Sequence, residues 1–175
     1  MSFERIGGEE IWKGHIGTVK VEKFRHDDGA VVQREVVEHP GAVVMLPFDG
    51  ERIWLVRQPR EAVGEDALLE LPAGKLNGGE VLDTAKRELR EEIGKAAAGW
   101  KFLTSFYASP GFTNEEIHAF LATGLSDDPL QAEEEERIEV VSEPLDRLDD
   151  LIRECRDSKS LVTLLWFRAF ELDQL

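Results

Sequence analysis

The stretch "GKLNGGEVLDTAKRELREEIGK", residues 74–95, decides how this chain folds, because it joins a glycine-rich loop to an acidic, regularly patterned segment. Leucine, alanine and isoleucine recur at spacings of three and four over residues 81–93, which predicts an amphipathic helix with one apolar face. Gly94 stands where a C-terminal glycine cap belongs. We therefore expect a helix over residues 81–93 that packs its apolar side onto a core.

A second face of this helix gathers carboxylates. Glu88 and Glu92 are four residues apart, Glu91 lies beside them, and Arg87 precedes Glu91 by four. Like charges at these spacings repel by about 0.2–0.5 kcal/mol per pair. Charge alone leaves two interpretations open. The face is either solvated and crossed by salt bridges, or it binds a hard divalent cation, because carboxylate oxygens are the ligands that Mg²⁺ prefers.

The spacing of these residues resembles the Nudix box, which reads Gly, five residues, Glu, seven residues, Arg-Glu-apolar-x-Glu-Glu-x-Gly-apolar. The matching positions are Gly74, Glu80, Arg87, Glu88, Leu89, Glu91, Glu92 and Gly94. The chain departs from the pattern twice, since six residues separate Glu80 from Arg87 and Lys95 stands at the final apolar position. The resemblance implies an α/β/α sandwich around a mixed sheet, and hydrolysis of a nucleoside diphosphate linked to some group X.

The resemblance also implies a Mg²⁺ centre, with Mn²⁺ as an alternative. The expected metal ligands are Glu80, Glu88, Glu91, Glu92 and the carbonyl of Ala73. Glu88 and Glu92 are thereby catalytic candidates, and Arg87 is expected to neutralise and orient one carboxylate. The missing residue would displace Glu80 by up to ~1.5 Å along the helix axis and ~100° around it. The carboxylates downstream of the gap keep their spacing.

Strand-like and helical patterns over the rest of the chain favour an α+β fold. Residues 1–38 would form a small N-terminal antiparallel β hairpin domain, with its turn at Asp28-Gly29. Residues 39–175 would form the Nudix domain. Within it, "GAVVMLPF", residues 41–48, is almost continuously apolar, so we expect a strand buried on both faces. Further strands are predicted over residues 52–58, 101–109, 117–125 and 137–145, and helices over residues 144–155 and 158–172.

Longer segments resemble the ADP-ribose pyrophosphatase branch of the family. They are "REVVEHPGAVVML", "VRQPREAVG", "LLELPAGK" and "YASPGFTNEEIHAFLA". Pro110 lies fifteen residues beyond Lys95, about where that branch carries a marker proline. The resemblance spans about residues 15–145 and implies hydrolysis of ADP-ribose to AMP and ribose 5-phosphate. It also implies a homodimer in which residues 1–38 reach the site of the partner copy.

A pyrophosphate needs cationic partners in a chain whose net charge is −15. Arginine binds phosphate bidentately, and by resemblance Arg60 is the best candidate for this contact. The other expected substrate-binding residues are Arg34, Glu35, Arg57, Ser109, Pro110, Gly111 and Phe112. The loop "SPGFT" is suited to line a pocket for the terminal ribose. Surface positions for the arginines and an ordinary turn for this loop remain the alternatives.

The acidic run "EEEE", residues 133–136, precedes "RIEVV" in the same way as the base-bearing loop of the branch. The resemblance makes Glu136 the expected general base, with Glu134 as the alternative. A metal-poised water needs only a modest base, because the cation has already lowered the pKa of the water. A base on a loop is also able to close over the site after substrate binds.

Composition narrows the remaining function classes. The acidic net charge argues against a nucleic-acid partner, and no apolar run approaches the length of a membrane span. The N-terminus lacks the pattern of a signal peptide and Cys155 is the single cysteine, so we expect a cytoplasmic location. Two alternatives to ADP-ribose hydrolysis stay open. One is the same chemistry on another nucleotide sugar or dinucleotide, such as GDP-mannose or NADH, and the other is a nucleotide-sugar sensor without catalysis.

Overall fold

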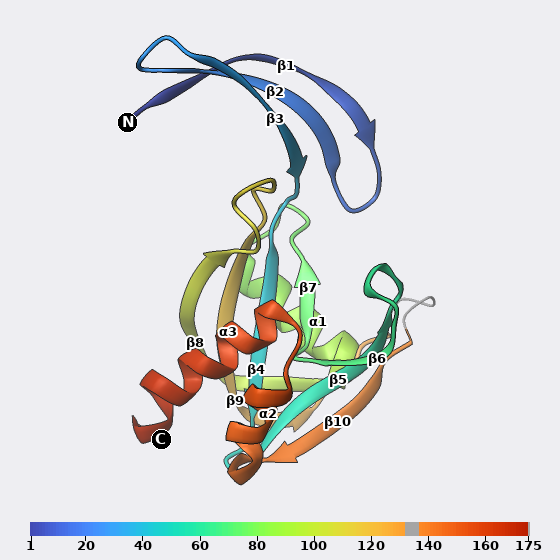
Figure 1. The fold of residues 1–175 in the computed structure, drawn as a ribbon. Helices are drawn as coiled ribbons and strands as arrows, with labels where there is room; N and C mark the ends of the chain where they lie inside the picture. The colour runs from blue at the N-terminus through green and yellow to red at the C-terminus, as the bar shows by residue number, and fades with distance from the viewer. Residues whose placement is uncertain (132–136, 175) are drawn as a thin grey trace. The chain divides into compact units, whose positions relative to one another are not determined.

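The computed structural model describes residues 1–131 and 137–174, and these residues divide into two compact units (Figure 1). The first unit comprises residues 1–41 together with residues 107–116. The second unit comprises the described residues of 42–106 and of 117 onward.

The sheet of the first unit is antiparallel, with the order β1-β2-β3. Its strands are β1 (Phe3–Lys13), β2 (Thr18–His26) and β3 (Val31–Glu38). The predicted hairpin corresponds to β2 and β3, and its turn contains Gly29 at a φ of 85°. Strand β1 extends the hairpin and was not predicted, because the adjacent Gly7 and Gly8 interrupt the alternation of apolar and polar side chains.

The segment 107–116 is tied to the end of β3. The Val37 N–H donates to the Phe112 carbonyl at 2.7 Å, and Val37 also forms a parallel bridge with Thr113. The His39 N–H donates to Asn114 Oδ1 at 2.7 Å. The "SPGFT" loop therefore belongs to the same compact unit as the N-terminal strands.

The second unit is built on a mixed sheet with the order β10-β5-β4-β9-β8, in which β6 also pairs with β5 and β7 with β4. The strands are β4 (Ala42–Phe48), β5 (Arg52–Arg60), β6 (Glu65–Glu70), β7 (Ala73–Lys75), β8 (Lys95–Tyr107), β9 (Glu116–Asp127) and β10 (Glu139–Pro144). Strand β4 runs parallel to β9, and each of its residues is buried. The prediction that this apolar run is covered on both faces is confirmed.

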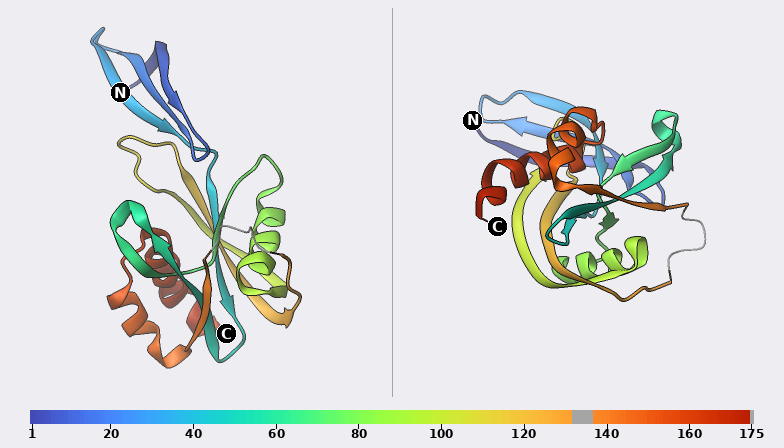
Figure 2. Two further views of the ribbon diagram at one scale, coloured as in Figure 1. Left: turned by 90° about the vertical axis from the view of Figure 1, so that its right-hand side faces the viewer. Right: turned by 90° about the horizontal axis from the view of Figure 1, so that it is seen from below.

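Helices cover both faces of this sheet, with α1 on one side and α2 and α3 on the other (Figure 2). Their bounds are α1 (Val81–Ile93), α2 (Leu148–Glu154) and α3 (Ser158–Trp166), and a π-helical turn, η3 (Phe167–Glu171), continues α3. Short 3₁₀ turns complete the chain at η1 (Glu61–Val63), η2 (Leu145–Arg147) and η4 (Leu172–Gln174). The expected α+β sandwich is confirmed. No helix within the described residues is long and apolar enough to span a membrane.

Helix α1 has the bounds that its pattern predicts. Ala85, Leu89 and Ile93 are buried and pack with side chains of β4 and β9, whereas Leu82 stays partly exposed at the margin of the apolar face. Gly94 ends the helix in the left-handed conformation, with a φ of 70°, and its N–H bonds to the Leu89 carbonyl. This packing turns the acidic face of α1 toward β7 and the end of β5.

Candidate active site

A pocket of about 330 Å³ lies beside α1 in the second unit. Its lining residues are Gln58, Arg60, Ala73, Gly74, Lys75, Asn77, Arg87, Glu88, Glu91 and Glu92. They come from β5, from β7 with the loop that follows it, and from α1. Most of the expected metal ligands and the expected phosphate-binding arginine thus meet in one place. Among the described residues, neither Arg57 nor Glu80 belongs to the lining.

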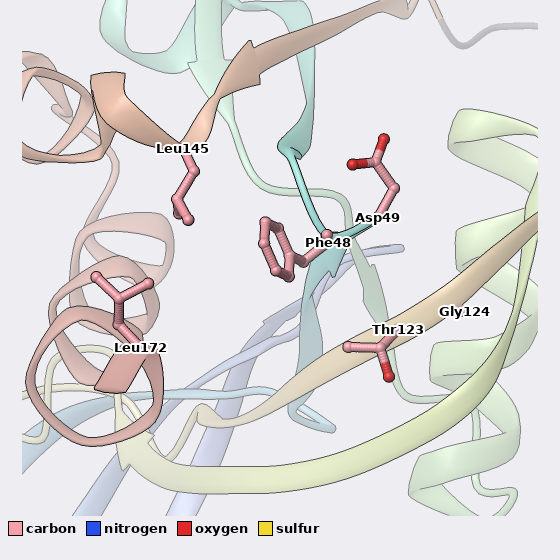
Figure 3. Close-up of a pocket in the computed structure, with 7 residues that line it drawn as sticks. Phe48, Asp49, Thr123, Gly124, Leu145 and Leu172 are labelled. Atoms are coloured by element: carbon pink, nitrogen blue, oxygen red, sulfur yellow. The ribbon is translucent and has the colours of Figure 1, made fainter. Parts of the chain in front are cut away.

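A larger hollow of about 500 Å³ in the same unit has a different character (Figure 3). Phe48, Leu145 and Leu172 give it an apolar wall. Its acidic residue, Asp49, accepts hydrogen bonds from the Trp54 indole at 2.8 Å and from backbone N–H groups of the β4–β5 turn. Asp49 therefore serves the turn, and the described residues that line the hollow include no set of reactive groups.

The backbone of β7 holds the buried carboxylates of α1. Glu92 Oε2 accepts a hydrogen bond from the Ala73 N–H at 2.9 Å. One turn earlier, Glu88 lies so close to Gly74 that a Cβ at that position would be 2.0 Å from Glu88 Cδ. Glycine at residue 74 is therefore required by this close approach, since any other side chain would displace the carboxylate.

Arg87 bridges two carboxylates of the same face. Its Nη2 donates to Glu88 Oε1 at 2.5 Å, and its Nη1 donates to Glu91 Oε2. Burial alone would lower the pKa of Arg87, but the negative charges of Glu88 and Glu91 outweigh it and raise that pKa. The arginine was expected to neutralise one carboxylate, and it contacts two. This pairing offsets much of the repulsion that the sequence of α1 builds in.

The donor groups of the pocket fit a hard divalent cation. Carboxylates of Glu88, Glu91 and Glu92 line it together with the backbone of Ala73, and oxygen donors of this kind suit Mg²⁺. Within the described residues, no three acidic, histidine or cysteine side chains converge as a complete ligand group. Arg87 engages only Oε1 of Glu88 and Oε2 of Glu91, so the second oxygen of each carboxylate remains outside this pairing.

Arg60 reaches the pocket from the end of β5 and is held from behind. Its Nε and Nη2 donate to the two carboxylate oxygens of Glu70 at 2.6 and 2.7 Å. Glu70 is 1% exposed, and it also accepts a hydrogen bond from Lys159 Nζ at 2.5 Å. Neither Glu70 nor Lys159 was predicted from the sequence. The available signal was a single acidic residue within the apolar run "ALLELPA".

Other expected site residues lie outside this pocket. Glu80 is exposed and immediately precedes α1, where its backbone carbonyl accepts a hydrogen bond from the Thr84 N–H at 3.1 Å. Arg57 is exposed on β5, between β10 and β6. Glu134 and Glu136 lie outside the described residues.

The remaining substrate-binding candidates belong to the first unit. Arg34 and Glu35 lie on β3, and Arg34 Nη1 donates to the Gln33 carbonyl at 2.8 Å. The loop that carries Pro110 and Gly111 is a tight turn, in which the Ser109 carbonyl accepts hydrogen bonds from the N–H groups of Phe112 and Thr113, each at 3.1 Å.

The second departure from the motif has a local explanation. Lys95 begins β8, directly after the cap of α1, where the pattern expects an apolar side chain. Its ammonium lies 4.1 Å from the centroid of the Trp54 ring and 2.8 Å from Asp127 Oδ1. A cation–π contact therefore takes the place of an apolar one against the same sheet.

Comparison with known proteins agrees with this geometry. The family model of the NUDIX domain matches residues 37–165. An ADP-ribose pyrophosphatase of Bacillus subtilis (strain 168) is 37% identical over 95% of this chain and 92% of its own length. A methanol dehydrogenase activator of Bacillus methanolicus is 36% identical over the same shares of the two chains.

The fold itself is shared with a solved structure. A crystal structure of an ADP compounds hydrolase superposes with a TM-score of 0.87 over 99% of this chain and 96% of that chain, at 22% identity. The family match, the relatives and the carboxylates of α1 all point to one assignment, in which divalent metals generally serve catalysis. This chain belongs to the Nudix hydrolase superfamily.

Proposed function

We propose that the chain hydrolyses the pyrophosphate of ADP-ribose, giving AMP and ribose 5-phosphate. The observation that carries the proposal is the pocket beside α1, which presents Glu88, Glu91 and Glu92 to the same space as Arg60 and Arg87. The Bacillus subtilis relative named ADP-ribose pyrophosphatase supports the choice of substrate, because the similarity covers nearly the whole of both chains.

We further propose Mg²⁺ as the physiological cation, with Mn²⁺ as a substitute. The residues that would hold it are Glu88, Glu91, Glu92 and the Ala73 carbonyl, with Glu80 as a further candidate. When bound, such a cation screens the charge of the diphosphate and makes a water molecule a better nucleophile.

The side chains of the chain divide the remaining work. Arg60 binds a phosphate oxygen, and Arg87 orients Glu88 and Glu91, the two carboxylates with which it pairs. Water attacks one phosphorus, so that a new P–O bond forms while the bridging P–O bond breaks. Glu136, or alternatively Glu134, accepts the proton that the water loses. Positioning and electrostatic stabilisation account for most of such a reaction.

Substrate contacts from the first unit complete the proposal. Arg34, Glu35 and the loop from Ser109 to Phe112, with Pro110 and Gly111, would contact the two ends of ADP-ribose. We propose that these contacts form in a homodimer, in which residues 1–38 reach the site of the partner copy. Support comes from the exposed apolar side chains of the N-terminal sheet, which include Phe3, Ile11 and Trp12.

We also propose a cytoplasmic location, since the single cysteine gives no sign of a disulfide framework.

A second candidate function is the same reaction on another nucleotide. The relative named methanol dehydrogenase activator favours keeping it, because this chain resembles it as closely as it resembles the Bacillus subtilis protein. The alternative substrates are represented by GDP-mannose and NADH. A third possibility is a sensor that binds a nucleotide sugar without cleaving it.

A substrate panel with Mg²⁺, resolved by chromatography, tests all of these. We expect ADP-ribose to show the highest kcat/KM, with AMP and ribose 5-phosphate as products. Preference for GDP-mannose or NADH by more than about tenfold in kcat/KM would replace the substrate and keep the chemistry. Binding without product in the presence of Mg²⁺ or Mn²⁺ would identify a sensor.

A further inference from the structure

A buried group of ionic side chains connects Arg60 to the beginning of α3. At its centre is Glu70, the last residue of β6, which is 1% exposed. Arg60 donates to both oxygens of this carboxylate, at 2.6 and 2.7 Å, and Lys159 donates to one of them at 2.5 Å. Both oxygens of Glu70 are thus engaged, and its side chain is held in one orientation.

The anchoring continues into the first turn of α3. Lys159 Nζ lies 3.0 Å from Asp157, the N-cap residue of the helix. Asp157 Oδ2 accepts hydrogen bonds from the N–H and the Oγ of Ser160, at 3.0 and 2.6 Å. Ser160 Oγ in turn accepts the Leu71 N–H at 2.7 Å, and Leu71 directly follows Glu70. The chain around Glu70 is therefore fixed to α3 through both its side chain and its backbone.

The electrostatics of this cluster favour an ionised Glu70. Burial would raise the pKa of Glu70, but hydrogen bonds and charge from Arg60 and Lys159 outweigh it and hold that pKa below its usual range. The hydrogen bond to Glu70 is the main cause that raises the pKa of Arg60, and the charge of Glu92 adds to it. Arg60 accordingly lies within reach of the electrostatic influence of the α1 carboxylates.

We propose that Glu70 and Lys159 are positioning residues that aim Arg60 at the diphosphate of the substrate. A guanidinium has five N–H donors, and Glu70 takes two of those of Arg60, so three remain for another partner. The Arg60 side chain is 41% exposed and lines the pocket beside α1. The inference rests on the proposed function, because it takes Arg60 as the phosphate-binding residue.

The arrangement answers a specific problem of this pocket. Arg87 pairs directly with Glu88 and Glu91, and an arginine that did the same from β5 would compete with both the cation and the substrate. The bidentate hydrogen bonds to Glu70 keep Arg60 from pairing with Glu88 and Glu91 in this way. Lys159 places a second positive charge beside Glu70, so that the charge of Glu70 is shared between two cations and neutralises Arg60 less completely.

Four variants test the inference, with two measurements on each. The variants are Glu70→Gln, Lys159→Met, Lys159→Arg and the control Glu171→Gln. Glu171 is likewise a buried glutamate paired with a lysine, Lys101, but it does not line the pocket. Steady-state kinetics with ADP-ribose and Mg²⁺ give KM and kcat. Calorimetric titration with inorganic pyrophosphate and Mg²⁺ gives an affinity that requires no turnover.

We expect Glu70→Gln to raise KM and weaken pyrophosphate binding by about tenfold, with a smaller change in kcat, because a misaimed arginine loses its bidentate contact. Lys159→Met should act in the same direction and Lys159→Arg should restore the parent values. Glu171→Gln should leave both quantities unchanged even if it lowers the unfolding temperature.

The outcomes separate this inference from the proposed function. If the parent fails to hydrolyse ADP-ribose, the proposed function fails, while the pyrophosphate titration still reports on Arg60. If pyrophosphate affinity in folded Glu70→Gln and Lys159→Met stays within about twofold of the parent, the positioning role is refuted. Should Glu70→Gln not fold, the two Lys159 variants decide. Equal losses in Lys159→Met and Lys159→Arg would show a purely structural lysine and overturn the inference.

Discussion

The substitution Gly74→Ala places a single methyl group where Glu88 now lies. The added Cβ would be 2.0 Å from Glu88 Cδ, 2.2 Å from Cγ and 2.3 Å from Oε1. An ordinary contact needs about 3.4 Å, so the carboxylate must move by about 1.4 Å. Because the clash is with the end of a side chain and not with backbone, we expect stability to fall only by the low end of about 1–3 kcal/mol. Activity should suffer far more, since a misplacement of about 1 Å in a catalytic group costs on the order of 10²-fold.

The measurements are kcat with ADP-ribose across a Mg²⁺ titration, and the unfolding temperature by circular dichroism. Gly79→Ala is the matched control, because it lies in the loop that follows β7 and its added Cβ would meet only Asn77 Oδ1, at 3.7 Å. We expect Gly79→Ala to behave like the parent. Activity of Gly74→Ala within about threefold of the parent, at any Mg²⁺ concentration, would refute the idea that Glu88 must occupy its observed position.

Four further predictions concern other parts of the chain. Glu92→Gln should abolish turnover with little loss of stability, because it removes a cation ligand while its oxygen still accepts the Ala73 N–H; activity within about tenfold of the parent at saturating Mg²⁺ contradicts this. Glu136→Gln should lower single-turnover rates by ~10²–10⁴-fold, and a large loss in Glu134→Gln instead would transfer the role of base. Light scattering should show a homodimer, and a fully active monomer would exclude the exchange of residues 1–38. Folding lowers the pKa of Glu70, so the ionised carboxylate stabilises the folded state fully above its unfolded pKa, and this stabilisation is lost as pH falls through the folded pKa. The difference in free energy of unfolding between parent and Glu70→Gln, measured by denaturant titration, should therefore become smaller in acid.

The elements predicted from sequence are those whose signal is local. Helix α1 has the predicted bounds because its apolar spacing and the glycine at residue 94 both lie within the segment. Strand β4 is buried throughout because seven consecutive residues have no solvent-adapted face. Strand β1 was not predicted, because its glycines and charged residues give no strand-like alternation, and its hydrogen-bond pairing with β2 is visible only in the structure.

The missing parts of the site depend on contacts between distant residues. Glu70 and Lys159 are 89 positions apart, and the sequence around neither residue predicts a contact with the other. The membership of residues 107–116 in the first unit also depends on a distant contact, the hydrogen bond between Val37 and Phe112. Such pairings depend on topology, which periodicity and residue spacing do not determine.

The charges of the pocket explain why a fold tolerates the acidic face of α1. Among the described lining residues, Arg60, Lys75 and Arg87 are cationic and three glutamates of α1 are anionic, so their formal charges cancel in a chain of net charge −15. The pyrophosphate of ADP-ribose carries two negative charges, which a neutral pocket in an acidic protein attracts poorly. One divalent cation supplies the missing two positive charges. We therefore expect the carboxylates to make substrate binding depend on the cation, with their mutual repulsion as the energetic consequence.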